Sequence, residues 1–291
     1  MTNPMITAID QVAVVVEDAG KTAKWMEQKL GLGPWVCLQF GDDGSPVRYG
    51  TIEDCVCEGD PIGTYSIDCC CCDMPNGVQL EVISPKTGSS IFARWLQRYG
   101  PGVQHISVVL SDSYEASIAR MAAAGHTQGQ FTTVMTTERC AFVEHLQDLG
   151  TYLELHKRPE SAGGPPDDSV DVTFLPGPTH EDLPQQPALF TQLEQINIET
   201  TDLQRSLTLL QDSYGIGPWQ RGDHSAVCDT LNIRLKLIET QETLPCGAVI
   251  RTLTAVKAAP AAEEVPAEAC AEGLRLPLRS TFGADLILRA E

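Results

Sequence analysis

The stretch GLGPW at residues 31–35 returns later in the chain as GIGPW at residues 215–219. A glutamine precedes each copy at the same distance, because Gln11 and Gln195 each lie 24 residues before the tryptophan that ends the motif. A shared spacing together with a shared motif indicates an internal repeat. The chain therefore consists of two related halves, and the longer first half is the place to read the fold.

Hydrophobic periodicity in the first half predicts a β-α-β-β-β unit that occurs twice. Residues 6–16 are apolar and rich in β-branched side chains, which favours a buried strand, and Asp18 and Gly31 are placed to begin and end a helix. Further strands are expected at 35–40, 46–57, 63–73 and 77–84, with a hairpin turn at 75–77 and a short helix at 88–99. The second unit is expected to have a strand at 103–110, a helix at 112–124 and strands at 131–136, 139–145 and 150–156. This pattern predicts an α+β fold.

Composition shifts divide the chain into three parts. Residues 1–158 form the first predicted domain, and residues 159–188 are rich in Pro, Gly and acidic side chains, as expected of a linker. Residues 189–291 are an abbreviated copy of the first domain. The shortening lies between Trp219 and Asn232, where 13 residues replace the 43 that separate the corresponding positions of the first copy.

Charge and hydropathy narrow the choice of partners. The 291 residues carry 20 Lys and Arg against 39 Asp and Glu, a net charge of −19, which repels nucleic acid and anionic membranes. No apolar run is long enough for a transmembrane helix, and the N-terminus lacks the basic segment of a signal peptide. We therefore expect a cytoplasmic protein, a monomer or homodimer, that acts on a small molecule.

The cysteines predict no thiolate metal site of the usual kind. Four of the eleven are consecutive, at residues 69–72, and neighbours in a strand point to opposite faces, so all four cannot converge on one tetrahedral ion. Apart from Cys69 and Cys72 within this run, no CxxC pair occurs, and the chain is too long for a secreted disulfide scaffold. We expect reduced cysteines, partly buried in strands.

Several segments in this order resemble one superfamily. They are IDQVAVVVED at 9–18, LGLGPW at 30–35, QLEVISP at 79–85, GVQHISVVL at 102–110 and GTYLELHKRP at 150–159. The pattern is similar to the vicinal oxygen chelate (glyoxalase/bleomycin resistance/dioxygenase) superfamily, and within it to the methylmalonyl-CoA epimerase-like branch. The resemblance covers nearly all of residues 5–158 and, more weakly, 190–290. It implies that tandem βαβββ modules form a half-barrel cleft.

The resemblance also implies a divalent metal held by four strands. The ligand positions fall on Gln11, where relatives usually have histidine, and on Glu81, His105 and Glu154. One imidazole, two carboxylates and an amide oxygen suit Mn²⁺, Co²⁺, Ni²⁺, Zn²⁺ or Mg²⁺. Each residue also has a plain structural interpretation: a backbone hydrogen bond for the glutamine, a satisfied core histidine, and acids paired with Lys or Arg.

The same resemblance implies roles in catalysis and substrate binding. Glu154 is a candidate acid or base as well as a ligand, and Glu144 is a candidate second acid or base. Glu53 and Glu58 lie on the expected wall of the cleft, and we assign Glu53 to substrate binding. Trp35 is a candidate substrate contact, although packing in the core is the alternative.

The second half lacks the implied ligands. Gln195 matches Gln11, but Lys236 falls at the position of Glu81 and Ile287 at the position of Glu154, and no histidine lies near the strand 247–255. A lysine opposes a dication, so this copy is expected to be structural.

Three functions remain open. The first is a metal-dependent isomerase, epimerase or lyase that stabilises an enolate of a small carbonyl compound, such as an acyl thioester or a polyketide-like acid. The second is a metal-free binding or resistance protein. The third is a ring-cleaving dioxygenase, which is disfavoured because its iron site requires two histidines and only His105 is available.

Overall fold

The structure is a computed structural model of the chain. It describes residues 4–41, 52–57, 60–61, 65–126, 128–134, 138–157, 187–259 and 265–289, with the backbone alone at 52–57, 60–61, 128–134, 138–140 and 156–157. Residues 159–186 of the predicted linker and Glu58 lie outside these residues, as does the side chain of Glu53. The boundaries proposed for the two domains therefore stay predictions.

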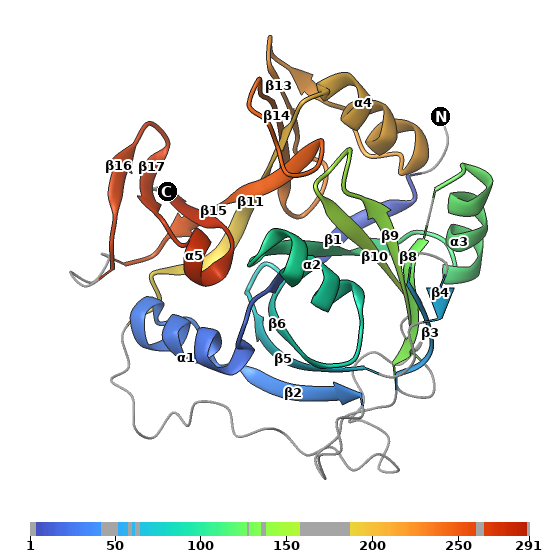
Figure 1. Ribbon diagram of the computed structural model, residues 1–291. Helices are drawn as coiled ribbons and strands as arrows, with labels where there is room; N and C mark the ends of the chain where they lie inside the picture. The colour runs from blue at the N-terminus through green and yellow to red at the C-terminus, as the bar shows by residue number, and fades with distance from the viewer. Residues whose placement is uncertain are drawn as a thin grey trace.

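Two βαβββ modules in the first half share one curved sheet (Figure 1). The first module comprises β1 (Ile6–Val15), α1 (Ala19–Leu30), β2 (Val36–Gly41), β5 (Ser66–Asp73) and β6 (Gln79–Thr87). The second comprises β7 (Gly102–Leu110), α3 (Tyr114–Ala123), β8 (Gln128–Val134), β9 (Glu138–His145) and β10 (Thr151–Lys157), and α2 (Ile91–Tyr99) connects the two. The strand order is β2-β5-β6-β1-β7-β10-β9-β8-β3-β4. The α+β class and the paired modules predicted from the sequence are confirmed.

The edge of this sheet departs from the order of the strands along the chain. β3 (Ile52–Cys57) and β4 (Asp60–Pro61) do not lie between β2 and β5, because β3 pairs with β8 at the opposite edge. Strand periodicity specifies which residues extend but not the partner across the sheet, so the sequence pattern missed this crossing.

The second half repeats the arrangement in a separate sheet of order β12-β13-β14-β11-β15-β18-β17-β16. Its first unit comprises β11 (Phe190–Thr200), α4 (Leu203–Thr208) with the π-helical turn Leu209–Ser213, β12 (Gln220–Arg221), β13 (Ser225–Cys228) and β14 (Arg234–Glu239). Its second unit comprises β15 (Ala248–Lys257), β16 (Glu268–Cys270), β17 (Gly273–Leu276), α5 (Arg279–Phe282) and β18 (Asp285–Arg289). In both halves the two central strands run antiparallel and each pairs in parallel with its outer neighbour.

The repeated motif adopts the same local structure in both halves. Asp18 caps α1 by accepting a hydrogen bond from the Lys21 amide, and Gly31 ends the helix in the left-handed conformation that glycine favours. The Gly-Pro bonds of both copies are cis. In each copy the tryptophan Nε1 donates to a backbone carbonyl three residues earlier, from Trp35 to Leu32 at 2.6 Å and from Trp219 to its counterpart at 2.8 Å. The motif therefore shapes the turn from helix to strand.

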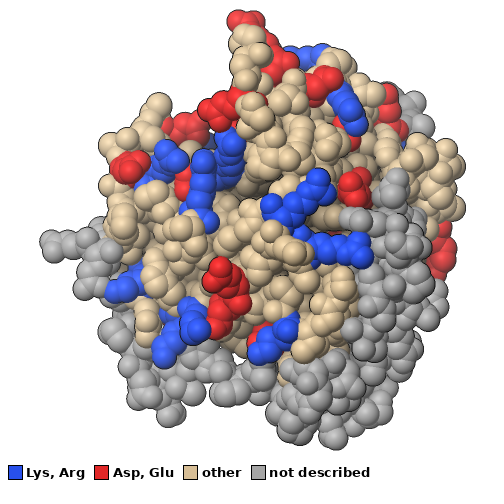
Figure 2. Space-filling view, viewed as in Figure 1, with Lys and Arg blue, Asp and Glu red and all other residues tan. Residues whose placement is uncertain are grey.

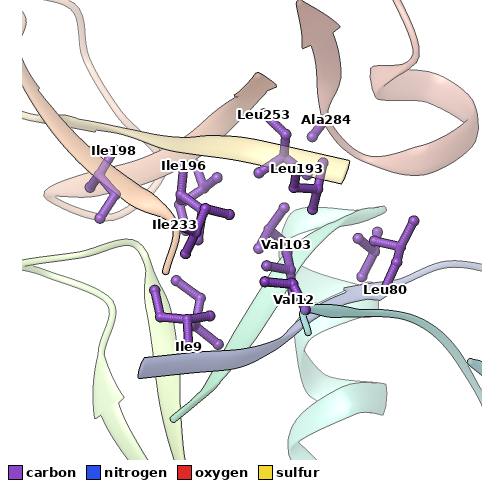
Figure 3. Close-up of a cluster of buried hydrophobic side chains, with 14 of the residues drawn as sticks. Ile9, Val12, Leu80, Val103, Leu193, Ile196, Ile198, Ile233, Leu253 and Ala284 are labelled. Atoms are coloured by element: carbon purple, nitrogen blue, oxygen red, sulfur yellow. The ribbon is translucent and has the colours of Figure 1, made fainter. Parts of the chain in front are cut away.

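The main core lies where the two sheets pack against each other (Figure 3). Val12 and Val103 of the first sheet meet Ile196 and Leu253 of the second, and all four are at most 1% exposed. Burial of apolar area at such a junction is the dominant stabilising force in a folded protein. The second half is thus an integral part of the core.

The other face of the first sheet is covered by α2. Ile91, Phe92 and Trp95 of this helix pack against a second apolar cluster that includes Ala13 and Tyr152. Ser90 begins the helix by accepting a hydrogen bond from the amide of Ala93. This covered face carries the candidate site.

One expectation about the cysteines was wrong. Cys37 of β2 and Cys70 of β5 lie directly opposite each other in the strand register and are joined by a disulfide. The sequence has no spacing rule for such a cross-strand pair, so the prediction of reduced cysteines failed here. The alternation within 69–72 is as predicted, since Cys70 and Cys72 face the main core whereas Cys69 and Cys71 face the second cluster.

The surface mixes charges of both signs. In the face shown in Figure 2, basic side chains lie beside acidic ones instead of forming a patch of one sign. Arg251, for example, pairs with Glu199 at 3.0 Å and with Glu242 at 2.8 Å. Among the described residues, no helix has the length and hydropathy needed to cross a membrane.

Candidate metal centre

Four adjacent strands each place one predicted ligand on the face beneath α2. β1 and β7 are central, so that Ala13 lies opposite both Glu81 of β6 and His105 of β7. Gln11 is two residues before Ala13 and thus on the same face of the sheet. Gln11 and Glu154 of β10 lie opposite the same residue of β7, one from each side. The parallel and antiparallel pairings of the four strands therefore gather residues that are up to 143 positions apart in the sequence.

The four side chains converge on one atom, the Nε2 of His105. The distances to it are 3.2 Å from the Glu154 carboxylate, 3.3 Å from the Gln11 amide oxygen and 3.4 Å from the Glu81 carboxylate. The side chains of His105 and Glu154 are 2% and 6% exposed, and that of Glu81 is 12% exposed. Solvent therefore reaches the group from the side of Glu81 and the half-buried Gln11.

A chain of hydrogen bonds orients the Gln11 amide. Its Nε2 donates to Gln79 Oε1 at 2.7 Å, and Gln79 Nε2 in turn donates to Asp73 Oδ1 at 2.7 Å. Since the nitrogen is held by Gln79, the oxygen of Gln11 points toward His105. This orientation makes an acceptor of the amide, as a metal ligand requires.

The imidazole of His105 is held on both sides. Its Nδ1 lies 2.7 Å from the Gln104 amide oxygen, and the rings of Phe92 and Phe142 pack against it with centroids 6.0 and 5.1 Å away. Burial by itself lowers the pKa of His105, but the Glu154 and Glu81 carboxylates outweigh burial and raise that pKa to about 9.

Sequence reasoning missed two cysteines at this site. Cys69 Sγ donates to Glu81 Oε1 at 2.7 Å, Cys71 Sγ lies 3.9 Å from the same oxygen, and the two sulfurs are 3.5 Å apart. The alternation of β5 and its pairing with β6 bring them there. Their spacing of two within a strand was a usable signal, but it pointed to a shared face without saying which side chain lay across from it.

The other predicted residues are more distant from this group. Glu144 of β9 lies opposite Tyr152 of β10, and Tyr152 lies opposite His105 of β7. Glu144 is therefore on the same face of the sheet as His105, two strands away. Trp35 is 7% exposed and belongs to the core between the sheets, which favours its packing role and gives the predicted substrate contact no support.

The second half carries other side chains at the equivalent positions. Asn197 lies opposite Lys236 of β14 and Thr252 of β15, as Ala13 lies opposite the acid and the histidine of the first half. Ile287 of β18 takes the place of Glu154. Because this set offers no carboxylate and includes a cation, its chemistry does not fit a divalent metal.

Comparison with known proteins links this arrangement to a family. Residues 10–142 match the family model described as the Glyoxalase/Bleomycin resistance protein/Dioxygenase superfamily. The match lies within the first two modules, and that part of the chain is similar to the superfamily. No curated protein matches the chain by sequence.

Solved structures show the same fold at low sequence identity. A hypothetical protein from Staphylococcus aureus aligns with a TM-score of 0.56 and 8% identity, over 98% of this chain and 99% of that one. A mutant of 4-hydroxymandelate synthase from Streptomyces coelicolor aligns with a TM-score of 0.51 and 15% identity, over 86% and 71%. Methylmalonyl-CoA epimerase from Mycobacterium tuberculosis has 21% identity over 56% of this chain and 97% of its own, but at a TM-score of 0.40 it carries no argument for the epimerase-like branch. These likenesses show the fold alone.

Proposed function

We propose that Gln11, Glu81, His105 and Glu154 hold one divalent cation and that the protein is a metal-dependent isomerase, epimerase or lyase. The substrate class is a small carbonyl compound, such as an acyl thioester or a polyketide-like acid. The observation that carries the proposal is that oxygens of Gln11, Glu81 and Glu154 lie within 3.2–3.4 Å of the Nε2 atom of His105, with each of the four side chains on a different strand.

The donor set fits such an ion. Three oxygen donors and one imidazole suit Mn²⁺, Co²⁺, Ni²⁺, Zn²⁺ or Mg²⁺. An Nδ1–H of His105 that donates to the Gln104 oxygen leaves the Nε2 lone pair directed at the three oxygens. The bond from Gln11 to Gln79 does the same for the amide.

The reaction proposed for this site is removal of a proton next to a carbonyl group. A bound divalent ion supplies positive charge to two neighbouring substrate oxygens and so favours the enolate. We assign removal of the proton to Glu154, whose buried carboxylate lies on β10 opposite Phe142 of β9, away from water. Glu144, on the same face two strands from His105, is the candidate that returns a proton.

A metal-free binding protein is the second candidate. The two carboxylates raise the pKa of His105 to about 9, so a protonated imidazole balances much of their charge at neutral pH without a metal. Such a trio is a stable arrangement in a ligand-binding face that performs no chemistry. A ring-cleaving dioxygenase is less well supported, because one histidine is present among the four converging side chains.

Metal analysis followed by isotope exchange tests the proposal. The chain is loaded with Mn²⁺, which favours carboxylate and imidazole over thiolate, desalted and assayed for bound ion, with Glu154→Gln, His105→Ala and the matched second-half variant Thr252→Ala alongside. We expect about one Mn²⁺ per chain in the parent and in Thr252→Ala, and none in the other two, as for a four-ligand site.

The loaded protein is then incubated in deuterium oxide with small carbonyl acids and acyl thioesters. Deuterium at the α carbon, seen by NMR and lost in Glu154→Gln, is the expected result. Absence of Mn²⁺ binding would support the metal-free candidate, and binding without exchange on any of these compounds would contradict the proposed reaction.

A further inference from the structure

Three potential ligand atoms lie together on the far side of Glu81. They are the sulfurs of Cys69 and Cys71 and the oxygen of Glu81 that does not face His105, and all lie within 4.8 Å of one another. Cys69 is 1% exposed, whereas Cys71 and Glu81 are half-buried. The group therefore has a closed side within the protein and an open side toward solvent.

The strands hold this group in place. Cys69 and Cys71 are two residues apart on β5 and so share one face, and Cys71 lies directly opposite Glu81 in the antiparallel pairing with β6. Glu81 thereby contacts two groups at once. Its Oε1 accepts from Cys69 at 2.7 Å and its Oε2 lies 3.4 Å from His105.

We propose that Cys69, Cys71 and Glu81 form a second metal subsite that binds a thiophilic divalent ion such as Zn²⁺. Glu81 then lies between two sites, with one carboxylate oxygen for each. This bridging role rests on the proposed function, whereas binding of an ion by the thiol pair does not.

The separation of the two sulfurs fits a shared ion. Two sulfurs bonded to one tetrahedral Zn²⁺ lie about 3.8 Å apart, given Zn–S distances of about 2.3 Å. The observed separation is 3.5 Å, far from the distance of about 2.0 Å in a disulfide. With Glu81 as the third ligand, the open side of the group leaves a fourth position for water or a substrate atom.

X-ray absorption of the Zn²⁺-loaded chain, handled without oxygen, tests this subsite directly. We expect zinc–sulfur scattering at about 2.3 Å from two sulfurs in the parent protein. Scattering from nitrogen and oxygen alone would overturn the proposal, and this measurement needs no variant.

Variants assign the signal, because Cys72, Cys228 and Cys246 are also free thiols. In Cys69→Ser with Cys71→Ser the hydroxyls preserve hydrogen-bond donors for Glu81, and the zinc–sulfur signal is expected to vanish. It should persist in Cys270→Ser, which removes a free, half-buried thiol of β16. Persistence of the signal in the double variant would place the ion elsewhere and overturn the proposal.

Mn²⁺ binding separates this outcome from the proposed function. The double serine variant should still bind Mn²⁺ through His105 and its partners, and His105→Ala should lose Mn²⁺ but keep the zinc–sulfur signal. If the parent shows the sulfur signal but binds no Mn²⁺, the proposed function fails and the thiol subsite stands.

Discussion

The two halves of the chain share one strand register but carry side chains of different charge at the matched positions. In the first half Ala13 lies between an acid and a histidine, and its methyl group leaves room for side chains from both neighbouring strands. In the second half Asn197 has that place, where it accepts from Gln195 at 2.6 Å and donates to Thr254 at 3.1 Å. Gln11 of the first half thus faces a histidine, whereas Gln195 of the second half is part of an uncharged hydrogen-bond network.

The contrast extends to charge. Lys236, at the position of the first half's Glu81, forms an ion pair with Glu272 at 2.8 Å. A cation held there would meet a positive charge and no carboxylate at the equivalent of Glu154. The fold is thus preserved while the donor set that we propose for a metal is not, because function depends on the side chains placed on a fold.

Removing one ligand is expected to have the largest effect. His105→Ala or Glu154→Gln should weaken Mn²⁺ binding by more than about 100-fold, since even loss of a residue that only supports a ligand costs about 10–100-fold. The matched change Thr252→Ala should leave affinity unchanged. Isothermal titration measures both, with circular dichroism to verify folding, and equal losses in both halves would contradict the contrast.

Ile196→Ala tests whether the second half is structural. This side chain is fully buried between the sheets, and truncating a buried isoleucine costs about 2–5 kcal/mol of unfolding free energy. Because Ile196 belongs to the second sheet and the main core, whereas the four proposed ligands lie on the face of the first sheet beneath α2, Mn²⁺ affinity should not change. Urea denaturation checks the first expectation. A loss below about 0.5 kcal/mol, the range of surface substitutions, would mean that the halves are not one core.

Loss of the hydrogen bond that orients Gln11 is expected to have a smaller effect on Mn²⁺ binding. Gln79→Leu removes the acceptor that orients the Gln11 amide, and we expect Mn²⁺ affinity to fall about 10-fold to 100-fold. Arg234 lies opposite Gln195 as Gln79 lies opposite Gln11, so Arg234→Leu is the matched control and should have no effect on Mn²⁺. Titration of the two variants side by side decides the point.

The junction between the halves should be sensitive to acid. His145 contacts the hydroxyl of Tyr214, and burial, with some help from the neighbouring His126, lowers the pKa of His145 to about 3. The unfolded chain takes up a proton at this histidine below about pH 6.5, whereas the folded chain does so only near pH 3. The free energy of unfolding therefore decreases as the pH is lowered from about 6.5 to about 3.

One such group contributes about 1.4 kcal/mol per pH unit within that window. His145→Gln, which does not titrate, should therefore lose less stability between pH 7 and pH 5 than the parent, as measured by urea denaturation at both values. An identical pH dependence in the two proteins would contradict the assignment.

Local signals predicted much of the fold. Helix α1 begins after Asp18 and ends before Gly31, as predicted. The apolar segments predicted as strands form β1 and β7, the two central strands. The sequence did not specify pairings between distant segments: β3 pairs at the far edge of the sheet, and Cys37 pairs with Cys70, against the expectation of reduced cysteines. Periodicity specifies the face of a residue, whereas its partner depends on how strands are ordered in space.

The candidate site shows the same division. The family pattern predicted the residues that converge on His105, but not the hydrogen bond by which Gln79 orients Gln11. The two thiols beside Glu81 escaped prediction as well, because each residue had an ordinary interpretation alone. Only the register of neighbouring strands makes them a group.

Anomalous diffraction from crystals grown with Mn²⁺ would test the central claim most directly. The predicted result is one strong peak bonded to Gln11, Glu81, His105 and Glu154, with no peak at Lys236 in the second half. A map with no peak among these four side chains at saturating Mn²⁺ would contradict it.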